Sequence, residues 1–194
     1  FLEMNTRLQV EHPVTECVTG LDLVAMQLDV AAGLHLGLTQ EDVVLTGHAI
    51  ELRLYAEDPA QGYLPQPGRY GGWSPAQDVR VDHGLQASGE ISPAYDPMLA
   101  KIIVHGPTRA VARRRALRAL EDTVFFGVGT NRGLLARVLR TADFVAGTVH
   151  TGWLAGRADL LPNPVLDDRA RAVAVAVWCA EKALGDGFRL SHRS

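Results

Sequence analysis

The first thirteen residues alternate between polar and apolar side chains, and this pattern constrains the fold more than any other. Polar residues occupy every second position, namely Glu3, Asn5, Arg7, Gln9 and Glu11. The apolar residues between them are Leu2, Met4, Leu8 and Val10. Because successive side chains of a strand point to opposite faces of a sheet, this period of two predicts a β-strand with one polar and one apolar face.

The polar face of this predicted strand combines groups that carry different chemistry. Glu3 and Asn5 offer the oxygen ligands that magnesium prefers, and Arg7 can bind an oxyanion. Glu11 can act as a general base. An alternating strand that turns charged side chains to solvent is also ordinary antiparallel design, and the pattern alone leaves that alternative open. At ~3.3 Å per residue, Glu3 and Glu11 stand ~26 Å apart in an extended chain, so a shared site requires a bend between them, with Pro13 just beyond it.

A second half-buried strand is predicted over residues 47–59, where polar and apolar side chains alternate again. Glu51 and Arg53 lie two residues apart on its polar face. They could form a surface ion pair worth well under ~1 kcal/mol, so the spacing alone gives Arg53 no catalytic role.

Three segments resemble motifs of one enzyme family. Residues 3–16, Glu-Met-Asn-Thr-Arg-Leu-Gln-Val-Glu-His-Pro-Val-Thr-Glu, resemble the active-site signature of biotin carboxylase, an ATP-grasp enzyme. Residues 48–59, which begin His-Ala-Ile-Glu-Leu-Arg, resemble the second signature of that family. Residues 93–101 resemble its Tyr-Asp-x-Met-x-x-Lys segment. Asp96 and Lys101 could lie near the biotin side of the site or at the subunit interface, and we assign them structural roles.

The resemblance implies a role for each polar residue of the first signature. Glu3 and Asn5 are expected to bind Mg²⁺ (or Mn²⁺) that bridges the phosphates of ATP. Arg7, Gln9 and the backbone of Val10 are expected to hold bicarbonate.

The resemblance also implies the two groups that carry the chemistry. Glu11 is expected to remove the proton of bicarbonate. Arg53 is expected to contact bicarbonate and to stabilise the enolate-like oxygen of biotin. A guanidinium suits that task because it stays charged and offers a planar fork of donors.

The implied activity is that of a biotin carboxylase, an ATP-dependent ligase that makes carboxyphosphate and then carboxylates biotin on a carrier domain. The implied partners are bicarbonate, the biotinylated carrier domain, a carboxyltransferase subunit and further copies of the subunit in a homo-oligomer. One alternative is a non-catalytic module that makes dimer and carrier-domain contacts. The other is a different ATP-grasp ligase, and the run from Arg7 to Glu11 together with the Arg53 motif argues against it.

Composition bounds the compartment and the partners. The 194 residues are 47% hydrophobic and 21% charged, with a formal net charge of −3, which gives no bulk attraction to nucleic acid or acidic membranes. No apolar run approaches the ~20 residues that a membrane span needs. Cys17 and Cys179 lie far apart without metal-ligand spacing, which favours a reducing compartment, and the cytoplasm is the expected location.

Further strands are predicted over residues 79–83 and 99–105, and helices over 19–33, 108–124 and from Asn131 to Arg140, with one more after Asp167. Thr108 is expected to cap the 108–124 helix. Its expected buried stripe is Val111, Leu117, Leu120 and Val124. Its other side carries Arg113, Arg114, Arg115 and Arg118. We interpret that cluster as a solvated or interface face, because no aromatic residues are interleaved with the arginines.

These elements predict an α+β architecture with a mainly antiparallel sheet and flanking helices. The resemblance divides it into the C-terminal end of an ATP-grasp domain with the active-site strand (1–46), a biotin carboxylase C-terminal domain (47–161) and the start of a linker toward the biotin carrier region (162–194). No Gly-rich phosphate loop precedes Glu3, so we expect a fragment that lacks half of the nucleotide site and is inactive alone.

Overall fold

The computed structural model describes residues 2–161, 172–173 and 176. The chain divides into two compact units, Phe1–Pro162 and Asn163–Ser194, and the elements named below belong to the first. Apart from residues 172–173 and 176, the helix predicted after Asp167 lies outside the described residues.

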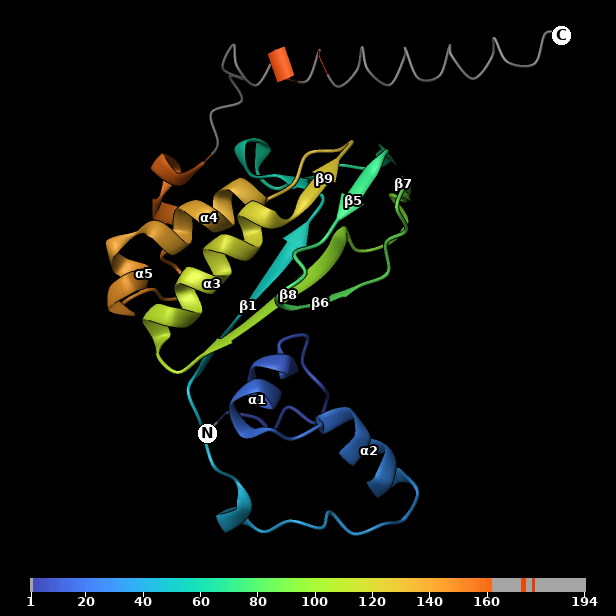
Figure 1. The fold of residues 1–194 in the computed structure, drawn as a ribbon, viewed down its shortest axis with the longest axis vertical. Coiled ribbons are helices and arrows are strands. Elements are labelled where there is room, and N and C mark those ends of the chain that lie inside the picture. The colour runs from blue at the N-terminus through green and yellow to red at the C-terminus, as the bar shows by residue number, and fades with distance from the viewer. Residues whose placement is uncertain (1, 162–171, 174–175, 177–194) are drawn as a thin grey trace, which may run out of the picture. The chain divides into compact units, whose positions relative to one another are not determined.

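A three-stranded antiparallel sheet forms the centre of the first unit, with strand order β1-β8-β6 (Figure 1). These strands are β1 (His48–Tyr55), β6 (Arg80–His83) and β8 (Met98–Gly106). They confirm the strands predicted over residues 47–59, 79–83 and 99–105. The α+β architecture with a mainly antiparallel sheet is confirmed as well.

The sheet is covered on one face by α3 (Arg109–Asp122), and α4 (Arg132–Arg140) packs beside it (Figure 1). Leu52 of β1 and Ile102 and Val104 of β8 point into this core and are at most 5% exposed. The other face carries the polar residues of β1 and lies against α1 (His12–Thr19). The alternation in β1 therefore separates the core from the face that meets the N-terminal segment.

Small side chains let α3 lie close to the sheet. The buried residues of this helix therefore differ from the stripe predicted from the sequence. Ala112, Ala116, Ala119 and Leu120 are the buried residues of this helix. Val111 and Leu117 are only half-buried, and Val124 is 37% exposed in β9 (Val124–Phe126). A Cβ added to Gly106 would lie 2.8 Å from the backbone nitrogen of Ala112, so the end of β8 approaches the helix backbone directly. Thr108 caps α3 as predicted, because its hydroxyl accepts from the backbone N–H of Val111.

Short elements complete the unit. The two-stranded pairs are β2 (Glu57–Asp58) with β3 (Leu64–Pro65), β4 (Gly68–Tyr70) with β7 (Gly89–Ile91), and β5 (Gly72–Ser74) with β9. A further helix is α5 (Ala142–Ala146), and 3₁₀ turns span Gln40–Asp42, Pro59–Gln61, Leu154–Gly156 and Ala158–Leu160.

The predicted N-terminal strand is wrong. Residues 2–9 form no strand, and Leu2 and Met4 are 103% and 71% exposed. A strand needs a neighbour to satisfy its backbone N–H and C=O groups, and no strand among the described residues pairs with this segment. The side-chain pattern is present, but no described strand offers this segment a hydrogen-bonding partner.

The helix predicted over residues 19–33 begins later than expected. Thr19 is the last residue of α1, and Gly20 follows it with a left-handed φ of 74°. Asp22 caps α2 (Leu23–Ala31) instead, because its carboxylate accepts from the backbone N–H of Ala25 at 2.8 Å. Gly33, also with positive φ, follows the end of α2, so the glycine stop was predicted correctly.

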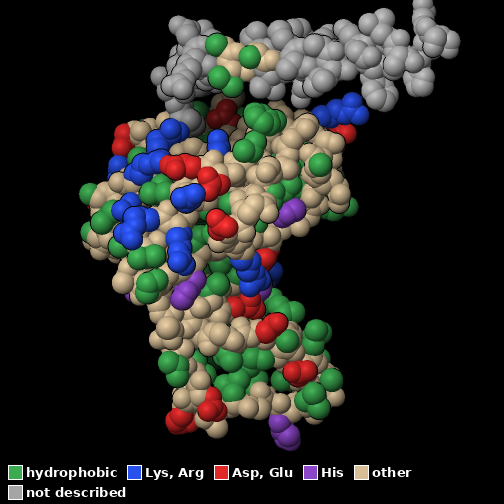
Figure 2. Space-filling model, viewed as in Figure 1, with side chains coloured by type: hydrophobic (Ala, Val, Ile, Leu, Met, Phe, Trp, Pro, Cys, Tyr) green, Lys and Arg blue, Asp and Glu red, His purple; other side chains and the backbone are tan. Residues whose placement is uncertain are grey.

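Arginine side chains gather over α3 and α4, interspersed with acidic ones (Figure 2). Arg113 donates to the carbonyl oxygen of Leu139 at 3.1 Å, and Arg115 donates to that of His105 at 2.6 Å. These arginines therefore link α3 to neighbouring elements. None of the described helices is both long and apolar enough to cross a bilayer.

Candidate functional site

The N-terminal segment bends where it enters α1. The backbone N–H of His12 donates to the carbonyl of Gln9 at 3.2 Å, and that of Val14 donates to Glu11 at 3.0 Å. Pro13 lies in the first turn of the helix, where a missing N–H costs nothing. The bend that the sequence required before Pro13 is present, and it leaves Glu11 at the N-cap position, facing the sheet.

Arg53 binds Glu11 and thereby joins two segments that are 42 residues apart in sequence. Its Nη2 donates to Glu11 Oε2 at 2.7 Å. The alternative that the sequence left open, an ion pair between Arg53 and Glu51, is not formed, because Arg53 pairs with Glu11 instead. A hydrogen bond from its own backbone N–H lowers the pKa of Glu11 most, burial opposes this, and the charge and hydrogen bond of Arg53 lower the pKa further by smaller amounts. Glu11 is accordingly a carboxylate at neutral pH.

Lys101 lies beside Glu11 as well, although the sequence favoured a structural role for it over a place near the biotin side of the site. The antiparallel register places Arg53 of β1, Lys101 of β8 and Asp82 of β6 in one row across the sheet. Lys101 Nζ donates to the carbonyl oxygen of Val10 at 3.2 Å and lies 3.4 Å from Asp82 Oδ2. The sequence could have indicated this place for Lys101 if the strands predicted over residues 47–59 and 99–105 had been paired antiparallel. That pairing sets Lys101 opposite Arg53.

A second ion-pair cluster fixes α1 to the sheet. Arg80 Nη1 lies 2.7 Å from Glu16 Oε2, and Arg80 Nε lies 2.9 Å from Asp82 Oδ1. The other oxygen of Glu16 accepts from the backbone N–H of Leu23 at 3.1 Å. Hydrogen bonds from Arg80, and then its charge and that of Lys101, lower the pKa of Asp82 against the effect of burial. One arginine thus connects β6, α1 and the start of α2.

Buried Asn131 holds the strand that carries Arg53. Its Nδ2 donates to the carbonyl oxygen of Arg53 at 3.1 Å, and its Oδ1 accepts from the backbone N–H of Tyr55 at 3.0 Å. The register of β1 against β8 shifts between Leu54 and Tyr55, so these bonds replace pairing that the irregularity interrupts. The backbone of Arg53 is therefore fixed from the side of α4.

Glu51 is a buried carboxylate whose two oxygens have no hydrogen-bond partner among the described residues. It lies two rows from Arg53 on the same face of the sheet, opposite Ile103, and Ile103 pairs in turn with Arg80. Burial raises the pKa of Glu51, and the charges of Lys101 and Arg53 only partly oppose that effect. Burial therefore disfavours the charged form of Glu51, and no hydrogen bond among the described residues offsets that cost.

Glu51→Gln is expected to raise the thermal stability of the chain at neutral pH. Because the pKa of Glu51 is higher in the folded state than in the unfolded chain, its ionisation opposes folding. That penalty is absent below the unfolded value of ~4.3 and grows as the pH rises through the folded value. The difference in Tm between variant and wild type should therefore vanish in acid and be largest at neutral pH. Thermal unfolding followed by circular dichroism measures this, and a variant that is less stable at neutral pH would contradict it.

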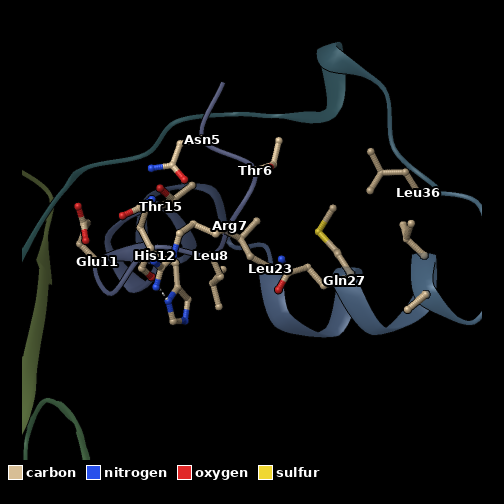
Figure 3. A pocket seen from close by; sticks show the side chains of 14 residues that line it. Asn5, Thr6, Arg7, Leu8, Glu11, His12, Thr15, Leu23, Gln27 and Leu36 are labelled. Atoms are coloured by element: carbon tan, nitrogen blue, oxygen red, sulfur yellow. Dashed lines mark hydrogen bonds between the residues drawn. The ribbon is translucent and has the colours of Figure 1, made fainter. Parts of the chain in front are cut away.

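A cavity of about 770 Å³ lies beside Glu11, between the N-terminal segment and α2 (Figure 3). Its lining includes four of the predicted site residues, namely Asn5, Arg7, Gln9 and Glu11. Apolar side chains of α2 form another part of the wall, namely Leu23, Met26 and Val30. Glu3, Val10 and Arg53 do not line it. Four of the predicted site residues therefore lie at one cavity. Arg53 and Lys101 lie on the sheet beside it, where Arg53 binds the Glu11 side chain and Lys101 binds the Val10 carbonyl oxygen.

The side chains of Glu3 and Asn5 are exposed and offer oxygen atoms, which suit Mg²⁺. Among the residues that the structure describes, no group of three or more His, Cys, Asp or Glu side chains could hold a metal ion. This part of the chain fits the metal as a partial ligand set, to which substrate phosphates and water would add oxygens.

Residues 51–156 match the family described as Biotin carboxylase C-terminal domain, and residues 1–39 match the Carbamoyl-phosphate synthase L chain, ATP binding domain. The biotin carboxylase of Nostoc sp. is 46% identical over 156 residues, which are 79% of this chain and 35% of that protein. The propionyl-CoA carboxylase alpha chain of Ruegeria pomeroyi is 45% identical over 177 residues, with 80% of this chain and 26% of that protein covered. The chain thus spans about a third or less of these two relatives.

A solved structure has the same fold. It is the biotin carboxylase domain dimer of the Hydrogenobacter thermophilus 2-oxoglutarate carboxylase, in complex with MgADP, ADP and bicarbonate. It superposes with a TM-score of 0.82 at 40% identity, over 85% of this chain and 37% of that one. Sequence motifs, sheet topology and these matches agree, and the chain belongs to the biotin carboxylase family and contains its C-terminal domain.

Proposed function

We propose that this chain is the C-terminal part of a biotin carboxylase subunit, which carboxylates biotin on a carrier domain with Mg-ATP and bicarbonate through carboxyphosphate. The longer protein is called the parent subunit below. One observation carries the proposal: the 2.7 Å bond between Arg53 and Glu11 joins the two signature segments into one site. In the proposed arrangement, residues 1–46 end the ATP-grasp domain, residues 47–161 form the C-terminal domain, and residues 162–194 lead toward the carrier region.

Glu11 is the base that takes the proton of bicarbonate in this proposal. Its pKa is lowered, so the carboxylate is ionised and ready to accept a proton. A carboxylate held by Arg53 is a weak base, however, because the guanidinium stabilises its charged form. Proton transfer therefore requires that Arg53 release Glu11. The proton passes to a Glu11 oxygen, and the bicarbonate oxygen that loses it attacks the γ-phosphate of ATP, with ADP as the leaving group.

Arg53 has a second task once Glu11 is protonated and neutral. Its guanidinium then lacks its counter-ion and can stabilise the negative oxygen that develops on biotin. Arg7, Gln9 and the backbone of Val10 are proposed to hold bicarbonate at the cavity beside Glu11. Magnesium held by Glu3 and Asn5 would neutralise charge on the ATP phosphates.

The same proposal includes the partners and the location. A biotinylated carrier domain, a carboxyltransferase subunit and a second copy of the parent subunit are the proposed partners, and the cytoplasm is the proposed compartment. The similarity to the propionyl-CoA carboxylase alpha chain and to a domain solved as a dimer supports the proposed partners.

The parent subunit tests the proposal directly. ADP release should require bicarbonate, and free biotin should be converted to a carboxylated product. ADP formation that requires an amine and ignores bicarbonate would instead indicate a different ATP-grasp ligase.

The 194-residue chain by itself is expected to bind Mg-ATP only weakly and to show no bicarbonate-dependent ATPase activity. Glu3 and Asn5 offer two metal ligands, which are too few contacts to offset the entropic cost of association. Isothermal titration calorimetry of the chain with Mg-ATP measures this, and the parent subunit is the positive control. Micromolar affinity of the chain alone would contradict the expectation.

A further inference from the structure

Lys101 makes contacts that an ordinary surface lysine does not make. Its side chain is 14% exposed and sits between the carboxylate of Asp82 and the carbonyl oxygen of Val10. Asp82 does not need this cation, because Arg80 already binds both of its oxygens at 2.9 and 3.0 Å. The contact that Lys101 alone supplies among the described residues is the one to Val10.

The Val10 carbonyl belongs to the peptide group that also contains the backbone N–H of Glu11. A peptide group is planar and trans, so a bond to its oxygen fixes the direction in which its N–H points. That N–H is the group that chiefly lowers the pKa of the Glu11 carboxylate. A cationic donor on the carbonyl also polarises the peptide and strengthens the bond that its N–H donates. Lys101 is thus connected through one peptide plane to the proposed base.

The sheet determines where Lys101 can be. Lys101 lies opposite Arg53 on one side and Asp82 on the other, and β8 is the central strand of the three. Arg53 holds the Glu11 side chain, whereas Lys101 holds the backbone immediately before it. Arg53 and Lys101, neighbours across the sheet, therefore bind the side chain and the main chain of the same segment, Val10–Glu11.

We propose that Lys101 is a positioning residue for Glu11: by binding the Val10 carbonyl oxygen it fixes the Val10–Glu11 peptide, and so the carboxylate, against bicarbonate. This inference rests on the proposed function, because it assigns Lys101 a task in that reaction. It concerns positioning, and Lys101 itself touches no substrate.

Lys101→Met in the parent subunit tests the inference, because methionine keeps much of the length and removes charge and donor. The kcat of bicarbonate-dependent ATP hydrolysis should fall about 10–10²-fold, the scale for a misplaced reacting group. The KM for ATP should stay within about two-fold of wild type, because the Val10 contact lies on the bicarbonate side of the site. Lys101→Arg keeps charge and donors and should recover part of the rate. Arg118→Met removes one cation from an exposed pair on α3 and should leave kcat unchanged.

Hydrogen–deuterium exchange separates positioning from general loss of structure. In Lys101→Met, amides of residues 9–14 should exchange faster, whereas those of α3 should keep wild-type rates. Should Lys101→Met fail to fold, Lys101→Gln, which is polar but too short to reach Val10, takes its place with the same expectations.

A kcat within about two-fold of wild type would overturn the inference and leave the proposed function intact. A fall in kcat without faster exchange at residues 9–14 would overturn it too, because Lys101 would then not act through Val10. If the wild-type parent shows no bicarbonate-dependent hydrolysis, the proposed function fails, and the assigned role of Lys101 fails with it.

Discussion

Glu11→Gln in the parent subunit is expected to lower bicarbonate-dependent turnover by about 10²–10⁴-fold, the range for removal of a positioned base. The amide preserves the shape of the side chain and its N-cap position, but it cannot accept the proton. ATP binding should be retained, because Glu11 is assigned to bicarbonate and not to the nucleotide. Steady-state ADP release at saturating bicarbonate, together with calorimetry for Mg-ATP, measures both quantities.

The loss in Glu11→Gln cannot be attributed to unfolding. The side chains of Arg53 and Glu11 are 40% and 54% exposed, and an exposed ion pair contributes only about 0–1 kcal/mol to folding. Glu41→Gln is the matched control, because the same chemical change falls on an exposed residue of the Gln40–Asp42 turn. Wild-type turnover in Glu11→Gln would mean that Glu11 is only a structural carboxylate.

Periodicity predicted the elements that carry both a core face and a polar face. The strand around Leu52 was predicted because its polar and apolar side chains alternate, and the strand around Ile102 because a short apolar run ends at Gly106 and Pro107. The same pattern at Leu2 and Met4 predicted a strand that the described chain does not form. Alternation of polar and apolar residues shows which side chains would share a face if the segment were a strand. Forming the strand also requires a neighbouring strand that pairs with its backbone N–H and C=O groups. Local patterns therefore identify a strand only where the partner is present.

The site was predicted as a set of residues but not as a set of contacts. The motifs named Glu11 and Arg53, but the only partner for Arg53 that the spacing offered was Glu51, two residues away on the same predicted face. Partner choice depends on where α1 docks on the sheet, and single-sequence patterns do not encode that docking. Lys101 was given a structural role for the same reason, because its importance arises from the register of β8 against β1.

The alanines of α3 show a related limit. Hydrophobic spacing selected large residues for the buried stripe, and the structure buries Ala112 and Ala116 instead. How closely a helix approaches a sheet is set by backbone contacts such as that of Gly106 with Ala112. Small side chains face the core where the approach is close, and a pattern that ranks residues by hydrophobicity alone does not identify them.

Arg53→Gln in the parent subunit is expected to lower biotin carboxylation by about 10²–10³-fold, the scale for losing one preorganised charge-stabilising donor. The structure adds a second expectation. Arg53 lowers the pKa of Glu11 by its charge and hydrogen bond, so its removal should raise that pKa. The acid limb of the pH profile of kcat/KM should therefore move to higher pH in the variant. Stability should change little, because the pair is exposed on both sides.

Arg53→Lys distinguishes a planar contact from a simple charge. Lysine retains the cation but not the fork of donors, so it should not rescue the rate if Arg53 must first bind Glu11 and then the developing oxyanion of biotin. Arg114→Gln, at an exposed position of α3, is the control for charge removal. The measurement is steady-state carboxylation of free biotin by the three variants across pH, with thermal denaturation alongside. Near-normal rates in Arg53→Gln and Arg53→Lys would leave Arg53 as no more than the partner of Glu11 in an exposed ion pair, and the catalytic role would be wrong.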